Sequence, residues 1–588
     1  MNKNIIKFIA ASLMVTSFTS CMKEFDVEKN YVSQEELEDA PKAFSSLVDA
    51  ITSNLSGEYT YSGASQYAND WGYPSILIQN DIMGQDIVPV DCTGNEWFST
   101  WYSGRVALGP NYAMCQMPWT YYYLWIKNCN IVIAYPKGEP NDEQKAGVGQ
   151  AYAMRAMLYL DLARMYSPKT YAEDKNALTV PKVTEETTTA VSTNNPRMTN
   201  EEAFKFILED LDKAEKYLTG YKRTTKYTPD LSVVYGLKAR AYLTMEDWQN
   251  AEKYAKLAQA GYTVMTAAQY TSHSEGFNKA NDSWMLATHN VSTNTNIKDN
   301  DGDGSWGAKM TTEQGSGCGY GANYGYPFYI DRHLYETIPS TDCRKKCFVD
   351  FAVDTYTKKV TDPKTGKETE VMDTEKVLNA LKANSDYPEL LASNKPTLGG
   401  LNAKFKNAGG SAGVSDQYVG WCMDIPLMRV EEMKLIEAEA VGMQPGREAE
   451  GIALLTAFAK TRDPQYVYGS HTNESYFAKR ANNFQNEVCW ERRAEFWGEG
   501  ITGYDIKRLE RGIIRSYANS NHPDLYRWNI STTPDWMNRC IPRSESAYNT
   551  GITSNNPTPS APVDNDAEYM GEQGVNKGVF FCRYIIEW

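Results

Sequence analysis

Two Gly-rich stretches of the sequence, residues 91–105 and 305–326, combine aromatic rings with amide and guanidinium groups. Flat rings can cover the C–H faces of sugar rings, while amides and guanidinium groups bond to hydroxyls. Flanking glycines allow backbone to come close to a ligand. These stretches predict ligand contacts from Asn95, Trp97, Trp101, Arg105, Trp306, Tyr320, Asn323 and Tyr324.

The spacing of the aromatic residues repeats between the two stretches. Trp97 and Trp101 are four residues apart, as are Tyr320 and Tyr324, so on a helical turn each pair presents its rings on one side. Our hypothesis is that the two loops converge into one open face that stacks on sugar rings. The alternative is that these rings anchor their loops to the core.

An acidic pattern near the C-terminus raises the question of catalysis. Glu491, Glu495 and Glu499 recur every four residues, and paired carboxylates can hydrolyse a glycoside. Arginines interleave with them, however, and buried carboxylates require cationic partners. We therefore predict a structural ion network, in which at least one arginine from an apolar helical stretch meets these glutamates; the candidates are Arg155, Arg240 and Arg429.

The sequence also contains half of a calcium-binding loop. Asp299, Asp301 and Asp303 alternate ahead of Gly304, as hard oxygen ligands do around Ca²⁺. Met310 occupies the place of the closing glutamate, so a solvated turn is the alternative. No other cofactor is expected, and no Gly-x-Ser-x-Gly elbow is present.

Composition and charge restrict the class of protein. The chain has 588 residues, of which 42% are hydrophobic and 12% aromatic, values typical of a globular protein. A formal net charge of −15 argues against nucleic acid as a partner. After the first 20 residues no apolar run is long enough to span a bilayer.

The N-terminus has the pattern of a secretory signal. Lys3 and Lys7 precede an apolar run that ends shortly before Cys21. We expect Cys21 to be the lipidated first residue of the mature chain. An ordinary signal peptide with an incidental cysteine is the alternative.

Helical periodicity covers most of the remaining chain. Helices are predicted at 33–55, 119–135, 143–166 and 200–218, followed by a tetratricopeptide-like pair over 237–258. Residues 271–425 are rich in Gly, Asn, Asp and Tyr and predict loops. Further helices are predicted from Pro426, from Asn486 to Trp497, and up to Gly512. The predicted divisions are 1–20 (signal peptide), 21–32 (lipidated tether), 33–270 (tetratricopeptide-like helices), 271–425 (loops) and 426–588 (C-terminal helices).

Several motifs, in the right order along the chain, resemble those of the SusD/RagB family. Glu491-Arg-Arg-x-Glu-x-x-x-Glu-Gly, followed by Asp505 and Lys507-Arg508, looks like its C-terminal signature. Pro426-x-x-Arg-x-x-Glu, the segments at 155–166 and 334–344, and Ile541-Pro-x-x-Glu545 are similar to others.

This resemblance implies a mainly α-helical, SusD-like fold. It also implies a non-catalytic, lipid-anchored protein on the outer membrane that captures oligosaccharides or polysaccharides for a SusC-like TonB-dependent transporter. A peptide-capturing protein of the RagB kind and, from another class, a surface glycoside hydrolase are the alternatives.

Overall fold

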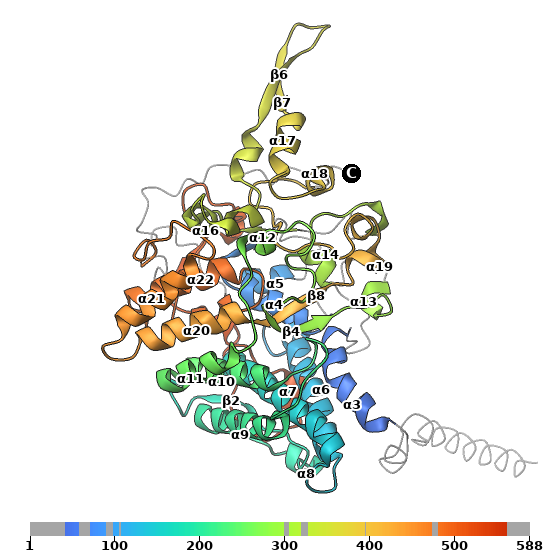
Figure 1. Cartoon of the computed structure of the whole chain (residues 1–588), viewed down its shortest axis with the longest axis vertical. Coiled ribbons are helices and arrows are strands. Elements are labelled where there is room, and N and C mark those ends of the chain that lie inside the picture. Colours follow the sequence, from blue (N-terminus) through green and yellow to red (C-terminus); the bar gives the residue numbers. More distant parts are fainter. Residues whose placement is uncertain are drawn as a thin grey trace, which may run out of the picture.

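The computed structural model describes residues 42–57, 71–89, 98–104, 108–298, 305–318, 327–393, 395–472 and 480–560. Helices dominate this part of the chain, and the strands are short and paired in twos. Figure 1 shows the helices α6 to α11 packed in the lower half and the C-terminal helices α20 to α22 beside them. The predicted mainly α-helical class with a tetratricopeptide-like scaffold is thus confirmed. No helix among the described residues is both long and apolar enough to cross a membrane.

The scaffold is built from long helices in sequence order: α3 (Ala43–Ser53), α6 (Ala113–Ala134), α7 (Asp142–Tyr166), α9 (Asn200–Leu218), α10 (Leu231–Met245) and α11 (Trp248–Ala258). Capping boxes at Asn141 and Thr199 begin α7 and α9, because each side chain accepts a bond from an otherwise unpaired backbone N–H. Gly147 and Gly149 let α7 come close to its neighbours. A Cβ at Gly149 would lie 2.8 Å from Leu218 of α9.

The C-terminal region differs from its sequence-based prediction at Pro426. Residues Asp424–Arg429 form the strand β8, which pairs antiparallel with β4 (Trp284–His289), and the helix α20 (Val430–Gly442) begins only after Arg429. The register shifts within this pair, and such irregularity allows a proline in a strand. The prediction that Pro426 begins the helix is therefore wrong.

The helix predicted at 486–497 is α22, Asn483–Glu495. It begins three residues and ends two residues earlier than expected. Glu491 and Glu495 lie on this helix, and Glu499 lies in the turn that follows. After Gly500, the next helix is α23 (Thr502–Arg508), with α21 (Glu448–Ala459) preceding α22. Gly498 and Gly500 have φ of 77° and 79°, a left-handed conformation that favours glycine and ends the helix.

Short elements connect these helices. They are α4 (Tyr73–Ile82), β1 (Ile87–Pro89), α5 (Phe98–Ser103), β2 (Leu178–Pro181), α8 (Thr189–Ser192), β3 (Arg197–Thr199), α12 (Ala267–Tyr270), α13 (Thr295–Lys298), α14 (Trp306–Met310), β5 (Phe328–Ile330), α16 (Arg332–Thr337), β6 (Thr357–Thr361), β7 (Glu368–Met372), α17 (Thr374–Leu381), α18 (Pro388–Ala392), α19 (Gln417–Gly420), β9 (Ile513–Ile514), β10 (Asn529–Ile530) and α24 (Arg543–Ser546). The hairpin β6–β7 projects from the top of the molecule (Figure 1).

Candidate ligand-binding site

The two predicted ligand loops are joined to one pair of strands. The chain leaves β1 at Pro89 for the first loop, and it returns from the second loop into β5 at Phe328. The strands are antiparallel, with Pro89 opposite Phe328 and Ile87 opposite Ile330. Opposed residues of such a pair have Cα atoms about 4.5–5.5 Å apart. The start of one loop and the end of the other therefore lie side by side.

The far end of the first loop meets the same point. It closes on α5, whose first residue is Phe98, and the Phe98 ring packs edge-on against Phe328 with centroids 6.0 Å apart. Phe98 also packs against Trp71 and Trp101, each with centroids 6.0 Å away. Both ends of the first loop, at Pro89 and Phe98, thus lie beside Phe328, where the second loop ends. We call β1, β5 and α5 the loop base.

An ion pair fixes the loop base to α22. Asp86, immediately before β1, accepts a bond from Arg493 Nη2 at 2.5 Å, and its backbone carbonyl accepts one from Trp497 Nε1 at 2.7 Å. The same carbonyl accepts the N–H of Asp331, just after β5, at 3.0 Å. Both strands are therefore attached to the helix that carries the acidic signature.

A second chain of hydrogen bonds holds α5 to β5. Tyr102 Oη lies 2.6 Å from His522 Nδ1, and His522 Nε2 lies 3.2 Å from the Asp331 carboxylate. Burial lowers the pKa of the His522 imidazole below its usual value, although Asp331 opposes this. A neutral ring in this position donates a hydrogen bond from Nε2–H to Asp331 and accepts one at Nδ1 from the Tyr102 hydroxyl. The three side chains thus form one directed chain.

Arg515 completes the support of α5. Its guanidinium carbon lies 3.9 Å from the centroid of the Tyr102 ring. It donates to the backbone carbonyls of Tyr102 at 2.6 Å and of Gly84 at 2.5 Å. Because Gly84 lies between α4 and β1, one buried arginine connects both sides of the first loop.

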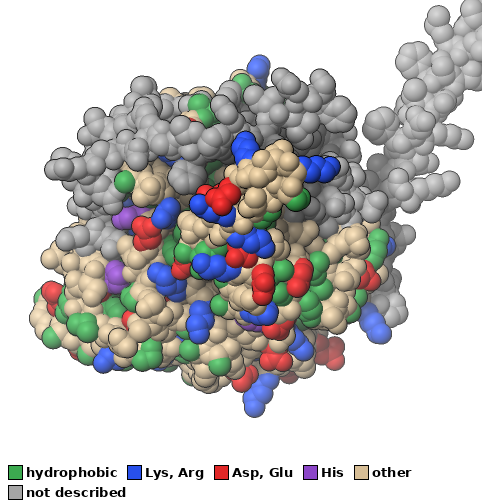
Figure 2. Space-filling view, turned by 90° about the horizontal axis from the view of Figure 1, so that it is seen from above, with side chains coloured by type: hydrophobic (Ala, Val, Ile, Leu, Met, Phe, Trp, Pro, Cys, Tyr) green, Lys and Arg blue, Asp and Glu red, His purple; other side chains and the backbone are tan. Residues whose placement is uncertain are grey.

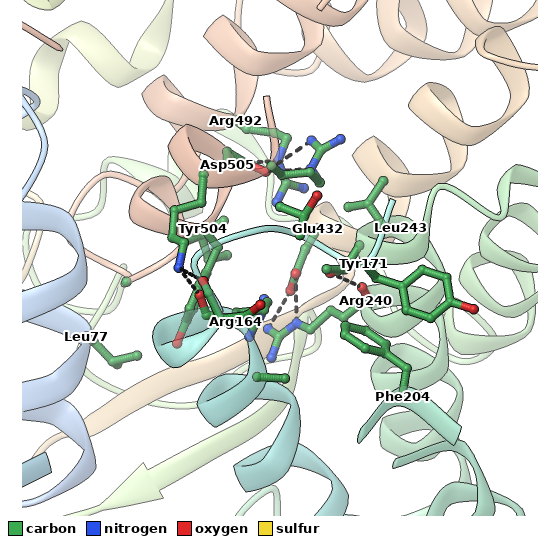
Figure 3. Close-up of a pocket in the computed structure, with 18 of the residues that line it drawn as sticks. Leu77, Arg164, Tyr171, Phe204, Arg240, Leu243, Glu432, Arg492, Tyr504 and Asp505 are labelled. Carbon is green, nitrogen blue, oxygen red and sulfur yellow. Dashed lines mark hydrogen bonds and ion pairs between the residues drawn. The ribbon is translucent and has the colours of Figure 1, made fainter. Parts of the chain in front are cut away.

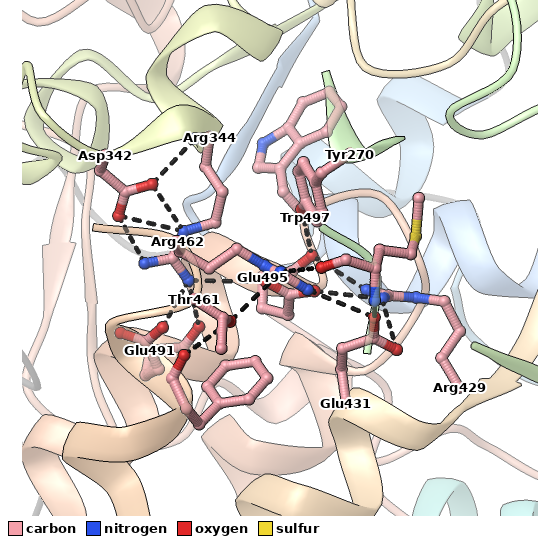
Figure 4. A network of polar contacts seen from close by, with 12 residues as sticks. Tyr270, Asp342, Arg344, Arg429, Glu431, Thr461, Arg462, Glu491, Glu495 and Trp497 are labelled. Carbon is pink, nitrogen blue, oxygen red and sulfur yellow. Dashed lines mark hydrogen bonds and ion pairs between the residues drawn. The ribbon is translucent and has the colours of Figure 1, made fainter. Parts of the chain in front are cut away.

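The acidic signature takes part in a buried charge network, and Figure 4 shows its part around Glu491 and Glu495. Glu491 pairs with Arg344 at 2.7 Å, and Glu495 pairs with Arg462 at 2.9 Å. Arg429 bridges two acids, with Glu495 at 3.0 Å and Glu499 at 2.8 Å. Lys404 lies 2.6 Å from Glu499. We call these residues the charge network: Glu491, Glu495, Glu499, Arg344, Arg429, Arg462 and Lys404. All of its side chains are buried.

The predicted contact between an arginine and these glutamates is present, through Arg429. The other two candidates pair elsewhere: Arg155 with Asp210 at 2.7 Å, and Arg240 with Glu432 at 2.6 Å. Sequence reasoning missed Arg344, Arg462 and Lys404. Arg344 and Lys404 lie in the stretch read as loop, where no helical periodicity indicated burial.

Two predicted ligand residues lie within the described structure, and both are buried. Trp101 and Trp306 are each 1% exposed, and Trp306 packs edge-on against Phe405 with centroids 5.3 Å apart. Neither ring presents a face to solvent in this structure, as the packing alternative expects. The predicted residues outside the described structure are Cys21, Asn95, Trp97, Arg105, Asp299, Asp301, Asp303, Tyr320, Asn323 and Tyr324.

Among described residues no group of three His, Cys, Asp or Glu side chains is arranged to hold a metal. On the face shown in Figure 2, acidic and basic side chains are interspersed over the described surface.

Comparisons with known proteins agree with this architecture. Residues 75–243 match a SusD-like family described as starch-binding and associating with the outer membrane. No curated protein matches the sequence. The structure is similar to a SusD-like carbohydrate binding protein from Bacteroides vulgatus (TM-score 0.63, 22% identity, covering 87% of this chain and 96% of that one).

Two structures from Bacteroides thetaiotaomicron are similar as well. One is a SusD superfamily protein (TM-score 0.61, 18% identity, 90% of this chain and 100% of that one). The other is surface glycan-binding protein A in complex with laminarihexaose (TM-score 0.60, 16% identity, covering 88% of this chain and 99% of that one). The family model thus matches residues 75–243, and the chain has the fold of solved SusD-like structures.

Proposed function

We propose that this chain is a non-catalytic glycan-binding protein of the cell surface. It captures oligosaccharides at the two aromatic loops and passes them to a SusC-like TonB-dependent transporter in the outer membrane. The protein is held at the membrane through a lipid on Cys21. Lipid chains bind a membrane through buried CH₂ groups and leave the polypeptide in water.

The observation that carries this proposal is the pairing of β1 with β5. It brings the ends of two loops, more than 200 residues apart in sequence, next to each other. The rings and polar groups assigned to ligand contact are Asn95, Trp97, Arg105, Tyr320, Asn323 and Tyr324. Trp101 and Trp306 anchor the loops from within.

The class of ligand is supported by chemistry and by likeness. Rings with adjacent amides suit a sugar, and the structure of the similar glycan-binding protein is a complex with laminarihexaose. Each stacked ring contributes about 1 kcal/mol, by analogy with aromatic pairs. Several rings are then needed, which favours an oligosaccharide over a monosaccharide.

Electrophoresis of the purified mature chain through gels containing different polysaccharides tests the proposal. Retarded migration without released reducing ends supports binding. Released reducing ends would indicate a hydrolase. Unchanged migration on every gel, with binding to peptides instead, would overturn the proposal in favour of peptide capture.

A variant pair locates the site. Trp97→Ala is expected to weaken glycan binding about fivefold, the equivalent of about 1 kcal/mol, with unchanged melting. Tyr548→Ala is the matched control, because Tyr548 is 79% exposed and lies outside both loops. Equal loss of binding in both variants would contradict the assignment.

A further inference from the structure

A cavity lies between the scaffold and the C-terminal helices, and no step of the proposed glycan capture uses it (Figure 3). Its walls come from α4, α7, α9, α10, β8, α20, α22 and α23. The apolar part includes Leu77, Phe204 and Leu243, and the exposed side chain of Lys169 marks its opening. Its volume of about 50 Å³ exceeds what one water needs, so it can hold a small polar molecule.

The acidic residues that line this cavity already have cationic partners. Glu432 pairs with Arg240 at 2.6 Å, and Asp505 pairs with Arg492 at 2.6 Å. Glu499, the third, is held by Arg429 within the charge network. None of these carboxylates therefore needs a cation from the cavity.

The cationic lining, in contrast, has donors left over. Arg164 Nε and Arg492 Nη1 are buried, and neither has a hydrogen-bond partner. The Arg164 guanidinium is fixed by Asp161 at 2.5 Å and by the Tyr504 ring, whose centroid is 3.6 Å away. Buried donors without partners are rare in native proteins because each costs about 1–3 kcal/mol.

Lys507 adds a third open donor. Its Nζ donates to the carbonyls of Arg164 at 2.6 Å and Ser167 at 2.8 Å, and an ammonium group has three N–H bonds. Lys507 is 9% exposed and forms no ion pair with any carboxylate of the described chain. Burial lowers its pKa to about 7, which is the consequence of a cation without a counter-charge.

We propose that this cavity binds a small oxyanion, a carboxylate or a phosphate, through Arg164 Nε, Arg492 Nη1 and Lys507 Nζ. An oxyanion supplies both the missing acceptors and the missing negative charge. Arginine donors suit planar or tetrahedral oxygen groups, and the apolar wall leaves space for a short carbon body. The site is separate from the loop base and does not depend on glycan capture.

Calorimetric titration of the mature chain with acetate and with inorganic phosphate, at constant ionic strength in chloride, tests this proposal. Saturable binding of either anion supports it, and the preferred anion identifies the chemistry. Lys507→Gln keeps an N–H for the carbonyls but removes the charge, and is expected to weaken binding about tenfold. Lys205→Gln, which removes an exposed charge on α9, is expected to change nothing. No saturable binding, or equal loss in both variants, would overturn the proposal.

Crystals of the unmodified chain soaked in selenate give a test that does not depend on the stability of a variant. An anomalous peak within hydrogen-bond distance of Arg164 Nε and Arg492 Nη1 is the expected result. Peaks only on the outer surface would refute the site. Trp97→Ala is expected to leave anion binding unchanged, so failure of the glycan proposal and failure of this one are distinguishable.

Discussion

The scaffold and the loop base differ in how far apart in sequence their contacting residues are. In the scaffold, α7 and α9 meet through apolar side chains, small residues such as Gly149 and one buried ion pair, Arg155 with Asp210, and these helices are near neighbours in sequence. At the loop base, Asp86 pairs with Arg493 across 407 residues. Both regions bury apolar surface. The loop base is also attached to α22 by buried ionic and polar contacts between residues far apart in sequence.

This contrast predicts that the charge network is the most sensitive point of the molecule. Arg429→Ala leaves Glu495 and Glu499 each without one of its cations in a buried site. We expect the free energy of unfolding to fall by about 3–5 kcal/mol, as when one partner of a buried pair is removed. Denaturant unfolding measures it, with Lys205→Ala as the exposed control. A loss no greater than the control's would mean that the network is structurally dispensable.

A substitution in the core of the scaffold is expected to lower stability without changing glycan binding. Leu237 of α10 is fully buried, and Leu237→Ala should cost about 2–5 kcal/mol through lost burial and the cavity left behind. Below its melting temperature, this variant should bind glycan as the unmodified chain does, because the loop base does not rely on Leu237. Reduced glycan affinity in the folded variant would break the distinction between the two regions.

Removing one buried tyrosine hydroxyl from each region compares the two regions through single hydrogen bonds. Tyr102→Phe removes the hydroxyl that His522 accepts, and should cost about 1–3 kcal/mol for a buried acceptor left unpaired. Because Tyr102 belongs to α5, we also expect weaker glycan binding. Tyr123→Phe is the matched scaffold variant, since its hydroxyl donates to the Pro181 carbonyl at 2.8 Å. It should leave glycan binding unchanged, and equal effects of the two variants on binding would contradict the account.

The smallest expected effect is the pH dependence of the free energy of unfolding that comes from Lys507, which lines the cavity between the scaffold and the C-terminal helices. Lys507 has an ordinary pKa of 10.5 when unfolded and about 7 when folded, so between these values the unfolded chain binds more protons. Stability from this group therefore rises with pH, by about 1 kcal/mol from pH 7 to 8. The difference in unfolding free energy between the unmodified chain and Lys507→Gln, measured without added phosphate or acetate, should follow this rise. A difference that does not vary with pH would refute the shifted titration.

The same contrast explains what the sequence could predict. The helix over residues 200–218 was predictable because its apolar stripe and the capping residues Thr199 and Glu202 are local signals. The strand at Asp424–Arg429 was not, because its partner β4 lies some 140 residues away and strand pairing leaves little local pattern. The burial of Trp101 and Trp306 was equally invisible, since ring type and spacing are the same in a packed loop and in a binding loop.

The cationic partners in the charge network show most clearly what could not be predicted from the sequence. The spacing of Glu491 and Glu495 indicated that buried cations must answer them, and Arg429 was among the three arginines considered. Arg344 lies in a short 3-10 helix and Arg462 in a turn, and nothing in the sequence of either segment marks a side chain as buried. Charge balance thus predicts that partners exist, and only the fold identifies them.

Titration of glycan binding in single variants tests the central claim, that the two loops form one site on the β1–β5 base. Trp97→Ala and Tyr324→Ala are titrated with the glycan that the gels identify. If both rings stack on one bound glycan, each single substitution should lower the affinity about fivefold while one glycan still binds per chain. Binding unaffected by one of the single substitutions, or two glycans bound per chain, would contradict a single site built from both loops.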